Sequence, residues 1–189
     1  MNRQYFPLVI VLSAMIFICS CGGKKTETAG ETNYDTTMVL VTDTAVYGRC
    51  GDGTMMHTLE LVTDEGKTMV FAVNEDSGSD VQGGMFAGDR MAVTYVETEE
   101  GLVADKVINL TSLMGRWTSL DKSFTMREDG NVESDLKVET RPYTSWTSVN
   151  GNIVLNVDTF SVLSLGADSM VLESEEGVFV YKRDKRDKR

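Results

Sequence analysis

Hydrophobic and polar residues alternate with a period of two along much of the chain after residue 36, which is the pattern of half-buried β-strands. In the segment 67–74, for example, one face carries Met69, Phe71 and Val73. The pattern predicts six strands in the first half of the chain, at 37–42, 45–50, 55–63, 67–74, 90–97 and 102–110. We therefore expect an all-β chain whose first folded domain is a small antiparallel barrel over 36–110.

Two acidic turns that end in glycine support the predicted strand boundaries. They are Asp64-Glu65-Gly66 and Glu99-Glu100-Gly101, and hairpins often have loops of this length and composition. Between the fourth and fifth segments lies an insert over 75–89 that is too long for a hairpin. Three strands, an irregular or weakly helical insert and a final hairpin resemble the oligonucleotide/oligosaccharide-binding (OB) barrel of five strands.

The second half of the chain has more strands and tighter turns. Asn150-Gly151 lies between two extended segments and is a strong hairpin signal, because both turn residues tolerate positive φ. Short strands are predicted around 113–117, 123–126 and 143–146, and then at 152–157, 159–165, 169–174 and 178–183. About eight short strands joined by tight turns favour an antiparallel up-and-down barrel over 111–183, with a short join near 109–112.

An ordered set of residues in this second half resembles a known family. Gly115-Arg116-Trp117 matches the Gly-x-Trp that opens lipocalin barrels. The rest is similar to short lipocalin-like domains of Bacteroidetes lipoproteins, through Asp129-Gly130, Tyr143, Trp146, Gly151, Asp158-Thr159, Asp168-Ser169, Tyr181 and Arg183. In lipocalins that tryptophan lies at the barrel base beneath an arginine from the last strand, so the resemblance implies that Trp117 and Arg183 close the barrel.

The interior of this barrel has two interpretations from sequence. Lipocalins generally bind small apolar molecules, which would require a cavity. Strands of this length build a wall only about 15 Å tall, however, and large side chains fill such a space readily. The candidate ligand-facing or core residues are Phe124, Met126, Trp146, Leu155 and Phe160.

The N-terminal segment indicates export and lipidation. The run from Tyr5 to Cys19 is apolar but too short to span a bilayer, which takes about 20 residues. It is followed by Ser20 and Cys21, which resembles a bacterial lipoprotein signal; an ordinary secretory signal is the alternative. We expect residues 1–20 to be a cleaved signal peptide, Cys21 to carry palmitate or another lipid as a membrane anchor, and 21–35 to be a flexible tether.

Charge narrows the classes of partner. The chain has 29 acidic and 18 basic residues, a net charge of −11. A nucleic-acid partner is therefore not expected, because phosphate binding needs a basic surface. The tail at 184–189 is basic, which predicts either a frayed, soluble end or contact with anionic lipid.

Few residues in the chain are suited to catalysis. The sequence has one histidine, His57, and one cysteine, Cys50, beyond the expected lipidation site. We expect no enzymatic activity, cofactor or metal site. The predicted function is that of a lipid-anchored protein of the cell envelope, at the outer membrane, which binds a small apolar ligand or an envelope protein partner. The alternative is a structural or envelope-stress-sensing lipoprotein whose barrels are packed.

Overall fold

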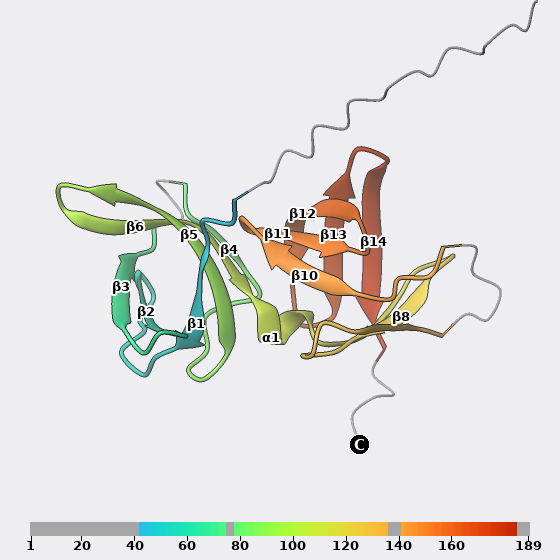
Figure 1. The fold of residues 1–189 in the computed structure, drawn as a ribbon, viewed down its shortest axis with the longest axis horizontal. Helices are drawn as coiled ribbons and strands as arrows, with labels where there is room; N and C mark the ends of the chain where they lie inside the picture. Colours follow the sequence, from blue (N-terminus) through green and yellow to red (C-terminus); the bar gives the residue numbers. More distant parts are fainter. Residues whose placement is uncertain (1–41, 75–77, 136–140, 185–189) are drawn as a thin grey trace, which may run out of the picture. The chain divides into compact units, whose positions relative to one another are not determined.

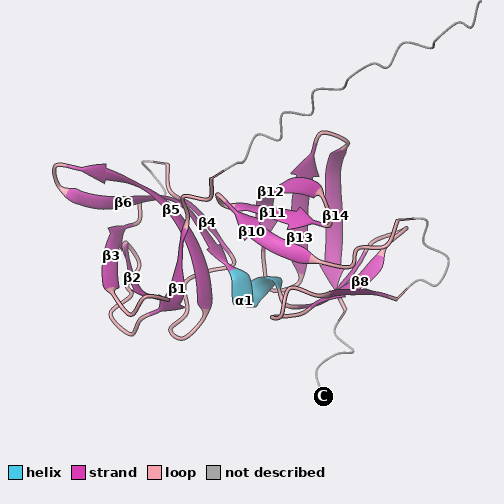
Figure 2. Cartoon of the chain, in the orientation of Figure 1, coloured by secondary structure: helices cyan, strands magenta, loops and turns pink. Residues whose placement is uncertain are grey.

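The fold is that of a computed structural model, in which residues 42–74, 78–135 and 141–184 are described. All of them belong to one compact unit, Val41–Arg189. The predicted signal peptide at 1–20, Cys21, the tether at 21–35, most of the strand expected at 37–42 and most of the tail at 184–189 lie outside the described residues. The described residues form two β-sheets and one short helix (Figure 1, Figure 2).

The first sheet is a closed five-stranded barrel with an added strand. Its strands are β1 (Val46–Cys50), β2 (Thr58–Thr63), β3 (Thr68–Ala72), β5 (Arg90–Thr98) and β6 (Gly101–Asn109). Antiparallel pairing joins β1 to β2 and β5, β2 to β3, and β5 to β6. A parallel pairing of β3 with β6, through Phe71 and Leu102, closes the ring. The small barrel of five to six strands expected in the first half of the chain is therefore confirmed.

The insert over 75–89 differs from the prediction of an irregular or weakly helical segment. It contains strand β4 (Asp80–Gln82), which pairs in parallel with β6. Val81 in this strand packs against the core of the first barrel. The join between the barrels also holds a one-turn helix, α1 (Leu110–Leu113). Asn109 caps this helix, since its side chain accepts a hydrogen bond from the backbone N–H of Ser112.

The second sheet is a nearly closed, eight-stranded antiparallel barrel. Its strands are β7 (Gly115–Thr118), β8 (Ser123–Met126), β9 (Val132–Ser134), β10 (Trp146–Val149), β11 (Asn152–Leu155), β12 (Asp158–Leu165), β13 (Ser169–Ser174) and β14 (Gly177–Arg183). Successive strands from β10 to β14 pair in order, β14 pairs with β7, and β7 continues to β8 and β9. Between β9 and β10 the pairing falls to a bridge from Asn131 to Ser145. This confirms the up-and-down barrel expected from the sequence.

The turns follow the chemistry that the sequence predicts. Asn150 and Gly151 have φ angles of 50° and 70°, as a two-residue hairpin loop with positive φ at both positions requires. Gly66 and Gly101, which end the two acidic turns, have φ angles of 79° and 130°. A side chain at these glycines would be strained, because L-residues rarely adopt such angles.

Burial along β5 shows why strict alternation fails where the two barrels meet. Met91 and Val93 face the core of the first barrel, as the period of two predicts. Ala92 between them is also buried, at 1% exposure, because it belongs to a second cluster that includes residues of the second barrel. Gln82 strengthens the same junction, since its side-chain oxygen accepts a hydrogen bond from the backbone N–H of Leu165.

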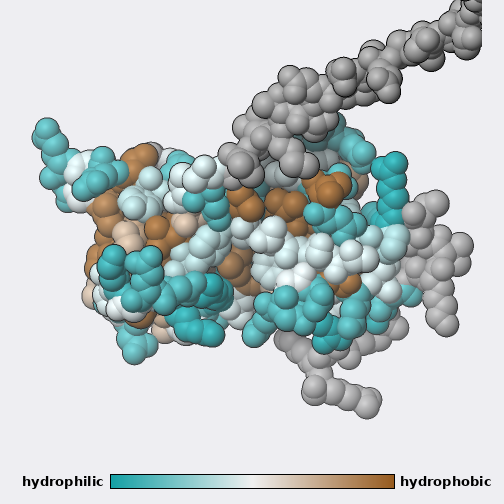
Figure 3. Space-filling model, in the orientation of Figure 1, coloured by the Kyte–Doolittle hydropathy of each residue, from teal (hydrophilic) through white to brown (hydrophobic). Residues whose placement is uncertain are grey.

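Exposed apolar side chains are distributed over both barrels. Figure 3 shows brown areas separated by polar ones on the face drawn, and the exposed large apolar residues include Met55, Met56, Val70, Phe86, Val96, Leu120, Val157, Leu163, Val178 and Val180. In the described part of the chain, no helix is both long and apolar enough to cross a bilayer.

Candidate functional site

The base of the second barrel is closed by the two residues that the sequence analysis pairs. The guanidinium carbon of Arg183 lies 4.1 Å from the ring centroid of Trp117. Trp117 is fully buried, and its indole N–H donates to the carbonyl of Leu113 at 2.8 Å. The Arg183 side chain donates to the carbonyls of Ser112, Met114 and Ala167. The cation thus covers the indole face and satisfies three carbonyls at the same end of the barrel.

Above this base, large side chains fill the barrel. Phe124, Met126 and Leu155 are at most 2% exposed. The Phe124 ring meets the rings of Tyr143 and Tyr181 edge to face, with centroids 5.3 Å and 5.2 Å away. Four of the five residues proposed as ligand-facing or core are therefore buried, since Phe160, at 3% exposure, belongs to the same core cluster.

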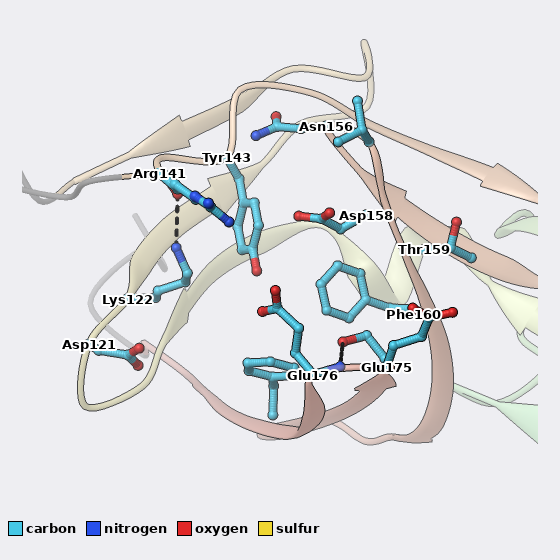
Figure 4. Close-up of a pocket in the computed structure, with 13 residues that line it drawn as sticks. Asp121, Lys122, Arg141, Tyr143, Asn156, Asp158, Thr159, Phe160, Glu175 and Glu176 are labelled. Carbon is cyan, nitrogen blue, oxygen red and sulfur yellow. Dashed lines mark hydrogen bonds between the residues drawn. The ribbon is translucent and has the colours of Figure 1, made fainter. Parts of the chain in front are cut away.

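The open end of the barrel holds a hollow of about 770 Å³, here called the mouth pocket (Figure 4). Three aromatic side chains line its apolar part: Tyr143, which precedes β10, Phe160 on β12, and Phe179 on β14. The pocket size is within the range of small-molecule sites. Among the five candidates, Phe160 alone lines this pocket.

The rim of the mouth pocket carries charges of both signs. Its cations are Lys122 and Arg141, and its carboxylates are Asp121, Asp158, Glu175 and Glu176. The Lys122 ammonium lies 4.4 Å from the centroid of the Tyr143 ring and donates to the carbonyl of Arg141 at 3.0 Å. Two more carboxylates than cations line the pocket, so its field is negative.

Trp146 does not lie in the mouth pocket. Its side chain is half-buried, and its indole N–H donates to the carbonyl of Arg127 at 2.7 Å. It lines two adjoining hollows of about 280 Å³ and 510 Å³ that also involve Arg90, Leu110 and Glu128. Trp146 is paired with the buried Leu155 and packs against the core cluster that contains Phe160, so it lies at the edge of that core, at the seam where β10 begins.

The two residues with most potential for metal or thiol chemistry lie elsewhere. Cys50 is 3% exposed, and burial raises the pKa of its thiol. His57 lies in an exposed turn before β2, not in the strand where the sequence analysis places it. No group of three or more potential metal ligands is found among the described residues.

Several residues of the mouth pocket are not among the candidates from sequence. Tyr143 enters the sequence analysis through the strand predicted at 143–146 and through the family pattern, but neither assigns its ring to the pocket, and the residue precedes β10 in the structure. Glu175 and Glu176 have the ordinary composition of a solvated turn between β13 and β14. The side-chain period of β14 is a usable signal for Phe179, which shares a face with the buried Tyr181.

Comparison of the chain with protein-family models, with curated proteins and with solved structures finds no match.

Proposed function

We propose that this chain is a lipid-anchored, non-enzymatic protein of the cell envelope that binds a small ligand with an apolar part in the mouth pocket. The observation that carries the proposal is an open pocket of about 770 Å³ with Tyr143, Phe160 and Phe179 in its wall. Tyr143 and Phe160 are 6% and 3% exposed at the top of the core, and the partly exposed ring of Phe179 continues this apolar wall toward the opening.

The lipocalin-like character of the second barrel is part of the same proposal. The contact of Arg183 with Trp117 supports it, since it is the pairing that the resemblance implies. The order of the strands supports it as well, because the first strand of the barrel, β7, pairs with the last, β14. The filled space above Trp117 limits the ligand to the upper part of the barrel.

The proposal of a lipid anchor rests on the sequence of the predicted signal peptide at 1–20 and of Cys21 after it. Lipid on Cys21 would hold the barrels near a membrane through the tether at 21–35, and the outer membrane is the proposed location. A small apolar molecule is present at high local concentration beside a bilayer, so a shallow pocket is sufficient to capture one.

A structural or stress-sensing role, with an envelope protein as partner, is the second candidate. The observation that favours it is the packing of Phe124, Met126 and Leu155, which are at most 2% exposed and fill the barrel above its base. The exposed apolar side chains are spread over both barrels rather than gathered on one strand pair, which gives this candidate less support.

Calorimetric titration of the full chain in nanodiscs separates the two candidates. The probes are octan-1-ol, octanoate and octyltrimethylammonium below their micelle concentrations, with empty nanodiscs as the blank. We expect saturable binding of at least one probe, weakened by Phe179→Ala and unaffected by Phe86→Ala, which removes an exposed ring of the first barrel. Absence of saturable binding by all three probes would favour the packed, structural role.

A further inference from the structure

The aromatic wall of the mouth pocket is built from rings set nearly at right angles. The centroids of Tyr143 and Phe160 are 6.3 Å apart with the planes at 83°, and those of Phe160 and Phe179 are 5.7 Å apart at 81°. In such pairs the positive edge of one ring meets the electron-rich face of another. Because the faces of aromatic rings attract cations, a pocket lined by several rings favours a positively charged group over an anion.

A cation of the protein already uses one of these rings. The Lys122 ammonium lies 4.4 Å from the centroid of the Tyr143 ring. Its hydrogen bond to the carbonyl of Arg141 holds it on that side of the pocket (Figure 4). Among the described residues, no cation is placed over Phe160 or Phe179. The partly exposed ring of Phe179 is therefore available to a cation from a ligand, whereas Phe160 is 3% exposed and supports that ring from the core.

Carboxylates lie among the aromatic rings of the mouth pocket. None of the four carboxylates of the rim forms a salt bridge with a described residue. In Figure 4 the carboxylates of Asp158 and Glu176 are directed toward the centre of the pocket, between the rings of Tyr143 and Phe160. A ligand ammonium at that position lies beside carboxylates and close to aromatic rings, which is the combination that stabilises a partly desolvated cation.

We infer that the mouth pocket selects a cationic amphiphile, that is, a molecule with a protonated or quaternary amine joined to an apolar chain. The inference rests on the proposed function, because it names the ligand class of the same pocket. The ammonium lies near Phe179 and Glu176, and the apolar chain lies along Phe160 and Val157 at the mouth. A fatty-acid carboxylate is disfavoured, since the rim carries an excess of like charge.

Three probes with the same eight-carbon chain test the inference, because they differ mainly in the charge of the head group. The full chain in zwitterionic nanodiscs is titrated with octyltrimethylammonium, octan-1-ol and octanoate. We expect the cation to bind roughly three- to thirtyfold more tightly than the alcohol, as cation–π energies imply, and octanoate to bind most weakly. Raising the ionic strength should weaken the binding of octyltrimethylammonium and leave the binding of octan-1-ol nearly unchanged.

Matched variants locate the effect. Glu176→Gln and Asp158→Asn should each reduce the affinity for octyltrimethylammonium severalfold while the affinity for octan-1-ol is retained, which also shows that the variants fold. Glu99→Gln, in the turn between β5 and β6, should change neither. Equal affinity for all three probes, or a preference for octanoate, would overturn the cationic class and leave the binding function intact. Absence of saturable binding by every probe would overturn both.

Discussion

Arg183 and Trp117 are direct partners in the pairing of β14 with β7, and the guanidinium of one lies over the indole of the other at 4.1 Å. This pair and the neighbouring pair of Lys182 with Thr118 therefore join the last strand of the second barrel to its first. The stacked cation also covers the base of the barrel and donates to carbonyls of Ser112, Met114 and Ala167. Burial lowers the pKa of Arg183 from its usual value, but a guanidinium remains charged at any physiological pH.

Replacement of Arg183 by alanine should lower the free energy of unfolding by about 2–4 kcal/mol, because it removes the stacking and leaves carbonyls without donors. Arg183→Lys should recover only part of the loss, since an ammonium lacks the planar fork. Urea denaturation measures both, with the exposed neighbour Lys182→Ala as the control. A loss for Arg183→Ala no larger than that of the control would contradict the proposed role of the pair.

Leu155 serves as a test of the packed interior. It is fully buried beside Phe124 and Met126 in the core cluster. Leu155→Ala should cost about 2–5 kcal/mol, as truncation of a buried leucine does. Val157→Ala, at an 87% exposed position of the mouth pocket, should change stability by less than about 0.5 kcal/mol. A small effect for Leu155→Ala would mean that this position lines a cavity.

The raised pKa of the Tyr47 hydroxyl predicts that the folded protein loses stability at alkaline pH. The Tyr47 hydroxyl lies 2.7 Å from the Asp43 carboxylate and 2.8 Å from the carbonyl of Ser148, which share its one proton. Burial, followed by the hydrogen bond to Asp43, raises the pKa of Tyr47 from 10.0 to about 12. A raised pKa in the folded state means that the stabilisation is complete below pH 10 and is lost as the pH rises through about 12. Urea denaturation across this interval should show a steeper decline for the wild type than for Tyr47→Phe. Parallel declines would contradict the assignment.

Replacement of Cys21 tests whether the chain carries a lipid anchor. Cells expressing the full chain and fed labelled palmitate should incorporate the label, and Cys21→Ser should abolish incorporation. Cys50→Ser serves as the control, since its thiol is buried and should carry no lipid. Label that persists in Cys21→Ser would contradict the proposed anchor.

The sequence predicts the two barrels because their strands are short, alternate in polarity and end in turns with glycine. The predictions at Asn150-Gly151 and at Gly66 are correct because backbone conformation there depends on local chemistry. The burial of Ala92 is not predicted from the alternation, since a second barrel covers the face of β5 that a single barrel would expose to water. Strand β4 is not predicted either, because its three residues are extended through their pairing with β6, a segment distant in the sequence.

The candidate site is predicted less well than the fold. Phe160 lines the mouth pocket, but Phe124, Met126 and Leu155 lie too deep, and Trp146 lies at the seam of the barrel. Alternation tells which face of a strand points inward, but it does not tell how far along the barrel the interior stops being filled. That depth depends on ring contacts between distant segments, such as that of Tyr143 with Phe160.

The most direct test of the account is a nuclear Overhauser measurement between octyltrimethylammonium and the full chain in nanodiscs, with the aromatic rings labelled. The account predicts contacts from the methyl protons of the ammonium to the ring of Phe179, and contacts from the alkyl chain to Phe160. Contacts confined to other rings, such as Phe86 or Trp146, or no contact with any ring, would contradict it.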